Sequence, residues 1–381
     1  MKKKTSSKYI KTLPKHLHIV SFDIPLPANY GGVIDVFYKL KALSKLGVKI
    51  HLHCFFKDRK SVNELKNYCE SVHYYKRQSA LKSLSSSLPF VVQTRNNKEL
   101  IKNLQKDNHP ILFEGLHCTF PLYHEDFSQR LTLVRAHNIE HSYYKGLANS
   151  ETKLSKKLFF NQEAKKLKKY ETILKKTTHV LSISPFEHSY FKDKFNTFYL
   201  PVFHQNECVK DLTSIGKYAL YIADLRISDN LKAARFLIEV FKKIDYPLII
   251  ASSFRNGSLQ KKLAPFKNIT FNEITCQSEA DDLLKHAHLN VMLSFQPTGI
   301  KLKLINTLFA GRFCVTNSII VKDTGLENLC YSADSIENFR TLVSTLKDRP
   351  FTSEMKEERQ KLLTDFIPTK NAQKLIDLIW S

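Results

Sequence analysis

Glycine is scarce in this chain, with ten residues among 381. No Gly-x-Gly-x-x-Gly sequence and no Walker-type loop occurs, which excludes the usual phosphate-binding loops of dinucleotide- and ATP-binding proteins. Because glycine is rare, each one is expected where no other residue fits the backbone. Gly31 and Gly32 are the only adjacent pair, and they follow the first strand-like run of the chain.

Long apolar runs are also missing. No segment approaches the roughly 20 apolar residues that cross a bilayer, and no signal-peptide core follows the lysine-rich N-terminus. The seven cysteines are scattered without Cys-x-x-Cys spacing, which indicates neither a disulfide framework nor a zinc site. We therefore expect a cytoplasmic protein whose cysteines are small buried hydrophobic residues.

Acidic residues are outnumbered, with 36 Asp and Glu against 59 Lys and Arg, for a formal net charge of +23. This charge favours anionic partners such as nucleic acid, an anionic membrane surface or phosphorylated small molecules. Neither a helix-turn-helix nor an aromatic-and-basic RNA motif is evident, so nucleic acid is not an expected partner.

Apolar patterns alternate between strands and helices along most of the chain. Predicted strands lie at 17–22, 48–55, near Val91, 111–113, 131–136, 179–183, 218–223, 248–251, 269–271, 289–293 and 314–316. Predicted helices lie at 33–46, around Leu100, at 151–176, 231–244, 280–286, 298–310 and beyond Pro368. This alternation predicts parallel sheets flanked by helices, with the chemistry in loops at the strand C-termini.

Two α/β halves of similar size indicate two domains. We predict a basic tail over 1–15, an N-terminal domain over 16–200, a linker over 201–216 and a C-terminal domain over 217–368. A last apolar helix over 369–381 needs a surface to pack on and is assigned to the N-terminal domain.

The predicted helix over 151–176 carries nine lysines beside an apolar stripe that includes Leu154, Leu158 and Leu167. A basic amphipathic helix can lie on an anionic membrane. The commoner arrangement is a solvated face over a packed stripe. Together with the net positive charge, this helix makes an anionic membrane surface at the inner face of the cell membrane an expected partner, and the packed helix is the alternative.

The stretch Thr298–Asn317 predicts an amphipathic helix of about three turns. Thr298 stands at the N-cap position and Gly311 at the stop, while apolar residues recur between them at helical spacing. Lys301 and Lys303 lie in the first turn, where the macrodipole is already positive. The cations, the free amides and Gly299 at the entrance describe a seat for a phosphate or diphosphate. The alternative is a surface helix with chance lysines.

Taken together, these features resemble the retaining family-four type of glycosyltransferase with the GT-B fold, which builds bacterial capsules, lipopolysaccharide and glycoprotein glycans. The resemblance spans nearly the whole chain after the tail. Its most specific segments are 27–32, 135–141, 181–184 and 299–311. It implies an α/β protein with two Rossmann-like parallel-sheet domains that face a cleft.

The resemblance implies transfer of a sugar from a nucleotide-sugar to a hydroxyl of a lipid-linked or glycan acceptor, with retention and without metal or other cofactor. It places His137 and Lys301 in catalysis, and His117 and Asn138 at the acceptor. The implied donor-binding residues are Gly31, Gly32, Arg226, Thr298, Gly299, Ile300, Lys301, Lys303 and Asn306.

The chain departs from this family at several positions. Relatives carry two glutamates separated by seven residues, and Thr298 and Asn306 stand at these places. Asn306 can still hydrogen-bond ribose hydroxyls. Asp224 and Asn230 replace an arginine and a lysine, with Arg226 and Lys232 nearby. The alternative to a divergent enzyme is therefore a non-catalytic GT-B protein that binds a nucleotide-sugar or assists a partner transferase.

Overall fold

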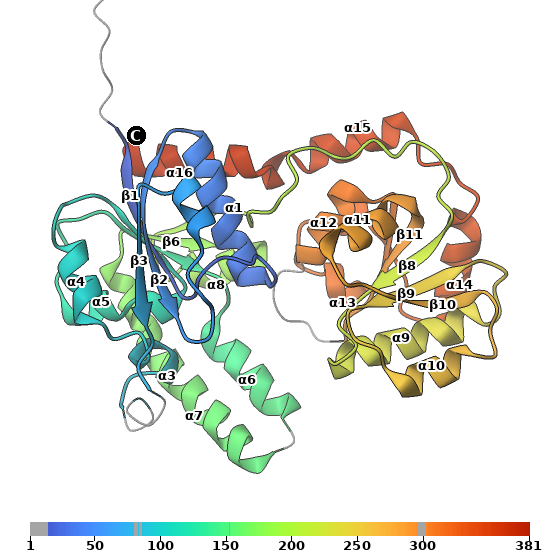
Figure 1. Cartoon of the computed structure of the whole chain (residues 1–381), viewed down its shortest axis with the longest axis horizontal. Helices are drawn as coiled ribbons and strands as arrows, with labels where there is room; N and C mark the ends of the chain where they lie inside the picture. The colour runs from blue at the N-terminus through green and yellow to red at the C-terminus, as the bar shows by residue number, and fades with distance from the viewer. Residues whose placement is uncertain (1–13, 80–82, 84–85, 152, 296–301) are drawn as a thin grey trace, which may run out of the picture. The chain divides into compact units, whose positions relative to one another are not determined.

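The computed structural model describes residues 14–79, 83, 86–151, 153–295 and 302–381. The chain forms two compact units. The first comprises Met1–Arg135, Tyr170–His179 and Ala372–Ser381, and the second comprises Ala136–Lys169 and Val180–Asn371. Both are built from parallel strands and helices (Figure 1). None of the helices in the described residues is long and apolar enough to span a bilayer.

The first sheet has seven strands in the order β3-β2-β1-β4-β5-β6-β7. The strand pairs whose register is described are all parallel, and β1 pairs with β2 over the whole length of β1. Its strands are β1 (His16–Ser21), β2 (Lys49–Phe56), β3 (Ser71–Lys76), β4 (Ile111–Glu114), β5 (Thr132–Ala136), β6 (His179–Ser182) and β7 (Thr197–Tyr199).

Seven α-helices are described between β1 and the first strand of the second sheet. Those used below are α1 (Gly31–Lys45), α3 (Phe90–Gln93), α4 (Lys98–Leu104), α5 (Phe120–His124), α6 (Glu140–Ser150), α7 (Leu154–Tyr170) and α8 (Pro185–Phe191).

The second sheet has six strands in the order β10-β9-β8-β11-β12-β13. Its strands are β8 (Tyr218–Ile222), β9 (Leu248–Ser252), β10 (Ile269–Glu273), β11 (Ala287–Met292), β12 (Phe313–Thr316) and β13 (Tyr331–Ser332). Its helices are α9 (Ser228–Phe241), α10 (Gly257–Leu263), α11 (Gln277–His286), α12 (Leu302–Ala310), α13 (Ser318–Val321), α14 (Ile336–Leu346) and α15 (Ser353–Leu362). The chain ends in α16 (Pro368–Trp380).

The second sheet is buried on both faces. Ala219 and Tyr221 of β8 pack in one core with α9 and α14, whereas Leu220 between them packs in another with Leu283 of α11. Successive side chains of a strand point to opposite faces, so a strand covered on both sides must be apolar throughout. This explains the continuous run from Tyr218 to Ile222.

The predicted alternation of strands and helices is confirmed, and some local predictions are wrong. Val91 lies in α3 after Pro89, where we expected a strand. The strand β3 was not predicted, because it is half-exposed and polar. The single helix expected over 151–176 is α7 followed by a 3-10 helix, Glu171–Lys176. Of the seven cysteines, Cys208 and Cys276 are exposed, contrary to expectation.

A chain of polar side chains crosses β1, β2 and β3 on one face of the first sheet. Asp107 accepts from His18 Nε2 at 3.0 Å, and His18 Nδ1 lies 2.9 Å from His53 Nε2. His53 Nδ1 lies 2.9 Å from the Tyr75 hydroxyl, to which Asn103 donates at 2.8 Å.

The ionised Asp107 can only accept, and this fixes every other role in the chain. His18 donates to Asp107 and accepts from His53, which in turn accepts from the Tyr75 hydroxyl. Burial is the main cause that lowers the pKa of His18 to about 4 and raises that of Tyr75 to about 12, so both groups are neutral at pH 7. Each buried polar atom named in this chain therefore has a partner.

Removal of the Tyr75 hydroxyl should destabilise the fold, because His53 Nδ1 and the Asn103 amide then lose a partner in a buried site. We expect Tyr75→Phe to lower the free energy of unfolding by about 1–3 kcal/mol. Tyr74→Phe is the matched control, because the Tyr74 hydroxyl makes only longer contacts of 3.3 and 3.4 Å with the backbone of Val62. Urea denaturation followed by circular dichroism measures both. Equal losses for the two variants would contradict this account.

Candidate functional site

Four charged side chains meet without solvent at the C-terminal end of β4 and β5. Asp35 and Lys39 come from α1, Glu114 from β4 and Arg135 from β5, and the relative exposure of each side chain is 0%. Lys39 Nζ donates to Asp35 at 3.0 Å and to Glu114 at 2.6 Å, and Arg135 donates to both Asp35 oxygens at 3.1 and 2.9 Å. Two cations balance two anions, as burial of charge requires.

This ion network fixes the backbone just before two predicted site residues, His117 after Glu114 and His137 after Arg135. His117 follows Glu114 by three residues, after Gly115, whose φ of +77° favours glycine. A Cβ on Gly115 would also lie 2.8 Å from His117 Nδ1. The backbone at the end of β4 is thus built to present His117, which is half-buried and has its ring near Phe22, at 6.0 Å between centroids.

The predicted glycine pair opens α1. Its first turn has no acidic residue, and the N-cap residue Tyr30 gives no side-chain cap. A Cβ on Gly32 would lie 2.6 Å from the Phe22 ring. The closeness of this ring is therefore one reason why glycine stands at position 32. The loop before the pair is held by arginines that the sequence did not single out: Arg59 donates to Ile24 and Pro27 carbonyls, and Arg77 and Arg95 donate to the Phe22 carbonyl.

His137 and Asn138 follow β5 directly and are half-buried. The charge of His137 reaches Glu187 in the first turn of α8. Burial raises the pKa of Glu187, and the hydrogen bond from Ser184 and the charge of His137 oppose this rise. Ser184 caps α8, because its hydroxyl accepts from the Glu187 amide at 3.3 Å.

In the second sheet, Lys303 approaches the end of β8 from the first turn of α12. Its Nζ lies 3.5 Å from the Ile222 carbonyl oxygen, and its charge reaches Asp224. Desolvation lowers the pKa of Lys303, and the Asp224 carboxylate opposes this effect. The Lys303 side chain is nevertheless exposed to solvent.

Arg226 is paired with Asp224. Its Nε and Nη2 donate to the two carboxylate oxygens at 2.9 and 2.8 Å, and the Arg226 side chain is 65% exposed. This hydrogen-bonded pair is the first cause of the lowered pKa of Asp224. Lys303 and Arg226 thus interact with the same carboxylate, Asp224, which the sequence marked only as a departure from the family.

The body of the predicted helix over 298–310 is present as α12, which ends before Gly311 as expected. A Cβ on Gly311 would lie 2.6 Å from the Asn290 amide, which explains glycine at this position. Asn306 is half-buried, and its side-chain oxygen Oδ1 accepts a hydrogen bond from Asn206 Nδ2 at 3.1 Å. Thr298, Gly299, Ile300 and Lys301 lie outside the described residues, so their predicted roles stay predictions.

Two residues missed by the sequence analysis hold the loop that follows β11. Asp229, in the first turn of α9, accepts from the Ser294 hydroxyl and the Phe295 amide at 3.2 Å. Asn317, after β12, bonds the Ser294 amide and carbonyl. A single polar residue in a loop forms no recognisable sequence pattern, so neither Asp229 nor Asn317 was predicted. Both lie at the C-terminal edge of the sheet, where parallel sheets bind ligands.

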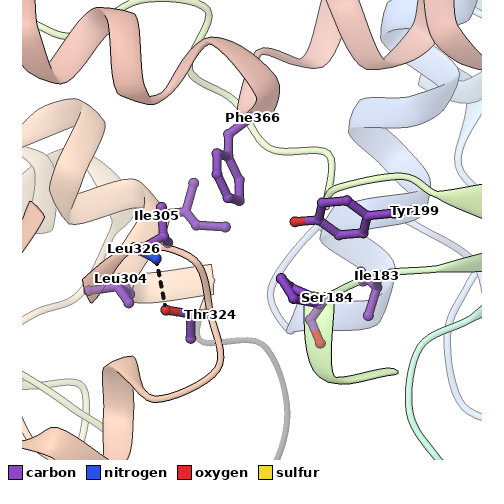
Figure 2. A pocket seen from close by; sticks show the side chains of 9 residues that line it. Ile183, Ser184, Tyr199, Leu304, Ile305, Thr324, Leu326 and Phe366 are labelled. Carbon is purple, nitrogen blue, oxygen red and sulfur yellow. Dashed lines mark hydrogen bonds between the residues drawn. The ribbon is translucent and has the colours of Figure 1, made fainter. Parts of the chain in front are cut away.

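A small hollow also lies in the second unit. Apolar side chains dominate its lining, with hydroxyl groups from Ser184, Tyr199 and Thr324 (Figure 2). The predicted site residues that are described do not line it, although Leu304 and Ile305 of α12 do. An uncharged lining of this kind does not suit a diphosphate.

Comparisons with known proteins establish the architecture. The chain has the GT-B fold. Structures similar to it include a variant of TarM from S. aureus in complex with fondaparinux, α-GlcNAc-glycerol and UDP, at a TM-score of 0.63 and 12% identity over 96% of this chain and 100% of that one. Another is the lipopolysaccharide outer core galactosyltransferase WaaB, at a TM-score of 0.60 and 11% identity over 95% and 99%. MurG of Acinetobacter baumannii gives a TM-score of 0.53 and 13% identity over 96% and 99%.

In sequence, the chain is similar to a Klebsiella pneumoniae protein named only as an uncharacterized 44.6 kDa protein in the cps region. The two are 27% identical over 367 residues, which cover 88% of this chain and 93% of the relative. Protein-family models give no match. The fold prediction of two Rossmann-like parallel-sheet domains is therefore confirmed, and the similar structures include glycosyltransferases.

The ion network predicts a strong and local effect of charge removal. Lys39→Met leaves Asp35 with one cation and Glu114 without its Lys39 partner in a site without solvent, and we expect a loss of about 3–5 kcal/mol of unfolding free energy. Lys41→Met on the same helix is the control, because Lys41 is exposed. Urea denaturation compares the two. A loss below about 1 kcal/mol for Lys39→Met would contradict the role given to this network.

Proposed function

We propose that this protein is a glycosyltransferase that moves a sugar from a nucleotide-sugar to a hydroxyl of a lipid-linked or glycan acceptor, with retention and without metal. The observation that carries the proposal is the GT-B fold with a cationic helix start, Lys303 of α12, at the C-terminal end of β8. The UDP and α-GlcNAc-glycerol in the similar TarM structure support this type of donor product and acceptor.

In the proposed reaction, the bond between the anomeric carbon and the donor phosphate oxygen breaks, and the electron pair leaves with the nucleoside diphosphate. The acceptor oxygen bonds to the anomeric carbon, and its proton passes to the diphosphate or to solvent. Negative charge grows on the diphosphate and positive charge on the sugar ring. Preorganised cations that neutralise the diphosphate lower the barrier.

Lys303 is the described residue best placed for this task, and Lys301 and the amides at 299–300 are proposed to complete the seat. Gly31 and Gly32 are proposed to approach the donor at the open start of α1. Asn306 takes the ribose, His137 the transferred sugar, and His117 and Asn138 the acceptor. Arg226 bonds Asp224 through Nε and Nη2, and its Nη1 is proposed to contact a phosphate.

Asp224 is the residue that most argues for the alternative. Its carboxylate already draws on both Arg226 and Lys303, so part of their charge is not offered to a ligand. A GT-B protein that binds a nucleotide-sugar weakly, or that assists a partner transferase without turnover, would tolerate this arrangement. The alternative is therefore a non-catalytic protein with the same fold.

A panel of nucleotide-sugars and nucleoside diphosphates tests the proposal. Ligands that bind only the folded state raise the melting temperature, so we expect at least one nucleotide class to stabilise the protein. The same donor should then be turned over by transfer or slow hydrolysis. Stabilisation without turnover would favour the non-catalytic alternative, and absence of both would refute the donor site.

Lys301→Ala should abolish turnover of that donor while the melting temperature of the free protein stays unchanged. The physical reason is the loss of one cation that stabilises the leaving diphosphate. Chromatographic detection of released nucleoside diphosphate gives the rate. Retained activity in Lys301→Ala would remove the phosphate-seat assignment.

Two substitutions around β8 should change diphosphate affinity in opposite directions. Lys303→Ala removes a cation and should weaken binding roughly tenfold, whereas Asp224→Asn frees two cations and should strengthen it. Lys285→Ala is the control, because Lys285 is an exposed lysine in the last turn of α11. Isothermal titration with the nucleoside diphosphate measures all three. Changes of the same sign for Lys303→Ala and Asp224→Asn would rule out charge competition.

A further inference from the structure

Three histidines meet at the N-terminal edge of the first sheet. His16 is the first residue of β1, His51 lies in β2, and His109 lies two residues before the start of β4. One ring nitrogen from each lies within 4.8 Å of the others. All three side chains are half-buried, so solutes reach them. This edge is opposite to the C-terminal edge, where Glu114 and Arg135 end their strands.

From this geometry we infer that His16, His51 and His109 form a site for a divalent transition-metal ion of the zinc type. Neutral imidazole nitrogens are the common protein ligands of Zn²⁺, Ni²⁺ and Cu²⁺. Three protein ligands leave one position of a tetrahedral ion open for water or another ligand.

The spacing of the first two ligands suits one ion. His16 Nδ1 and His51 Nε2 lie 3.0 Å apart. Two ligands of a tetrahedral zinc ion, each bonded at about 2.0–2.1 Å, are about 3.3 Å apart. Small ring rotations therefore turn the present hydrogen bond into two metal bonds, and the proton between the rings moves to the other nitrogen of its own ring.

A second contact already orients His51. Its Nδ1 lies 2.9 Å from the Ser71 hydroxyl on β3. Metal-binding histidines usually bond a neighbouring group through the nitrogen that does not hold the metal, and this contact fixes the tautomer and the ring plane. Ser71 supplies such a partner, because its hydroxyl oxygen can accept a hydrogen bond from His51 Nδ1–H.

The third ligand is held by its backbone. The His109 amide donates to Asp107 at 2.9 Å, and Asp107 is itself bound by His18 and Arg130. The His109 ring stacks on His16 at 4.6 Å between centroids, and it must turn out of this stack to coordinate. His109 itself lies outside the helices and strands.

One carboxylate interacts with this group. The charge of Glu70 reaches His51 and His16, and Glu70 itself pairs with Lys49 at 3.1 Å. The carboxylates of Asp35 and Glu114 in the ion network are paired with Arg135 and Lys39 and do not belong to this group.

A bound ion would tie the start of β1 to β2 and to the turn before β4. Its effect is then on stability rather than on the proposed transfer reaction, which lies at the other edge of the sheet. The inference does not depend on the proposed function.

Titration of the untagged full-length protein with zinc chloride at pH 7.5, after treatment with a chelator, tests the inference. We expect one equivalent to bind with micromolar or tighter affinity and to raise the melting temperature. The titration uses the Cys208→Ser and Cys276→Ser background, because these two exposed thiols could bind zinc themselves.

His16→Gln and His109→Gln should each weaken zinc binding at least tenfold and remove the thermal shift. His73→Gln is the control, because His73 lies in β3 and stacks on His53 without belonging to the group of three. Circular dichroism verifies that each variant is folded. Absence of binding at 100-fold molar excess of zinc, or equal affinity in His16→Gln, His109→Gln and the parent, would overturn the proposal.

Discussion

The buried network of Asp35, Lys39, Glu114 and Arg135 is the constraint on which the first unit depends. Buried charges are stable only when each is paired. The bonds from Lys39 to Glu114 and from Arg135 to Asp35 therefore fix the position of α1 along β4 and β5. Apolar packing alone would tolerate small shifts of the helix, because it has no direction. The network therefore positions the start of α1 and the loops after both strands, where the predicted glycine pair and histidines are found.

Much of the fold was predictable from the sequence, because strands buried on both faces are continuously apolar. The run from Tyr218 to Ile222 is an example, and Gly311 marked the end of α12 for a reason visible in the structure, its closeness to Asn290. The edge strand β3 was not predicted because most of its side chains are polar and only partly buried. Val91 was assigned wrongly because a short apolar run fits a strand and a helix equally well.

The candidate site was predictable only in part. Lys303 was found from its conflict with the helix dipole, a signal that depends on local sequence alone. The contact of Asp224 with both Lys303 and Arg226 could not be predicted, because it depends on elements that meet only in the folded chain. The same holds for the hydrogen bonds of Asp229 and Asn317 to the loop after β11. The histidine group of the first sheet has the same cause: His16, His51 and His109 are distant in sequence and become neighbours through strand register.

The polar chain from Asn103 to Asp107 has an electrical direction. Each of its four hydrogen bonds points the same way, so the bond dipoles add along a line that crosses three strands and ends on a carboxylate. Cooperative polarisation strengthens such an array, and the reversal of any one link would require the reversal of all. Asp107 thus breaks the symmetry between two proton arrangements that would be nearly equal in energy if a neutral amide stood at its end.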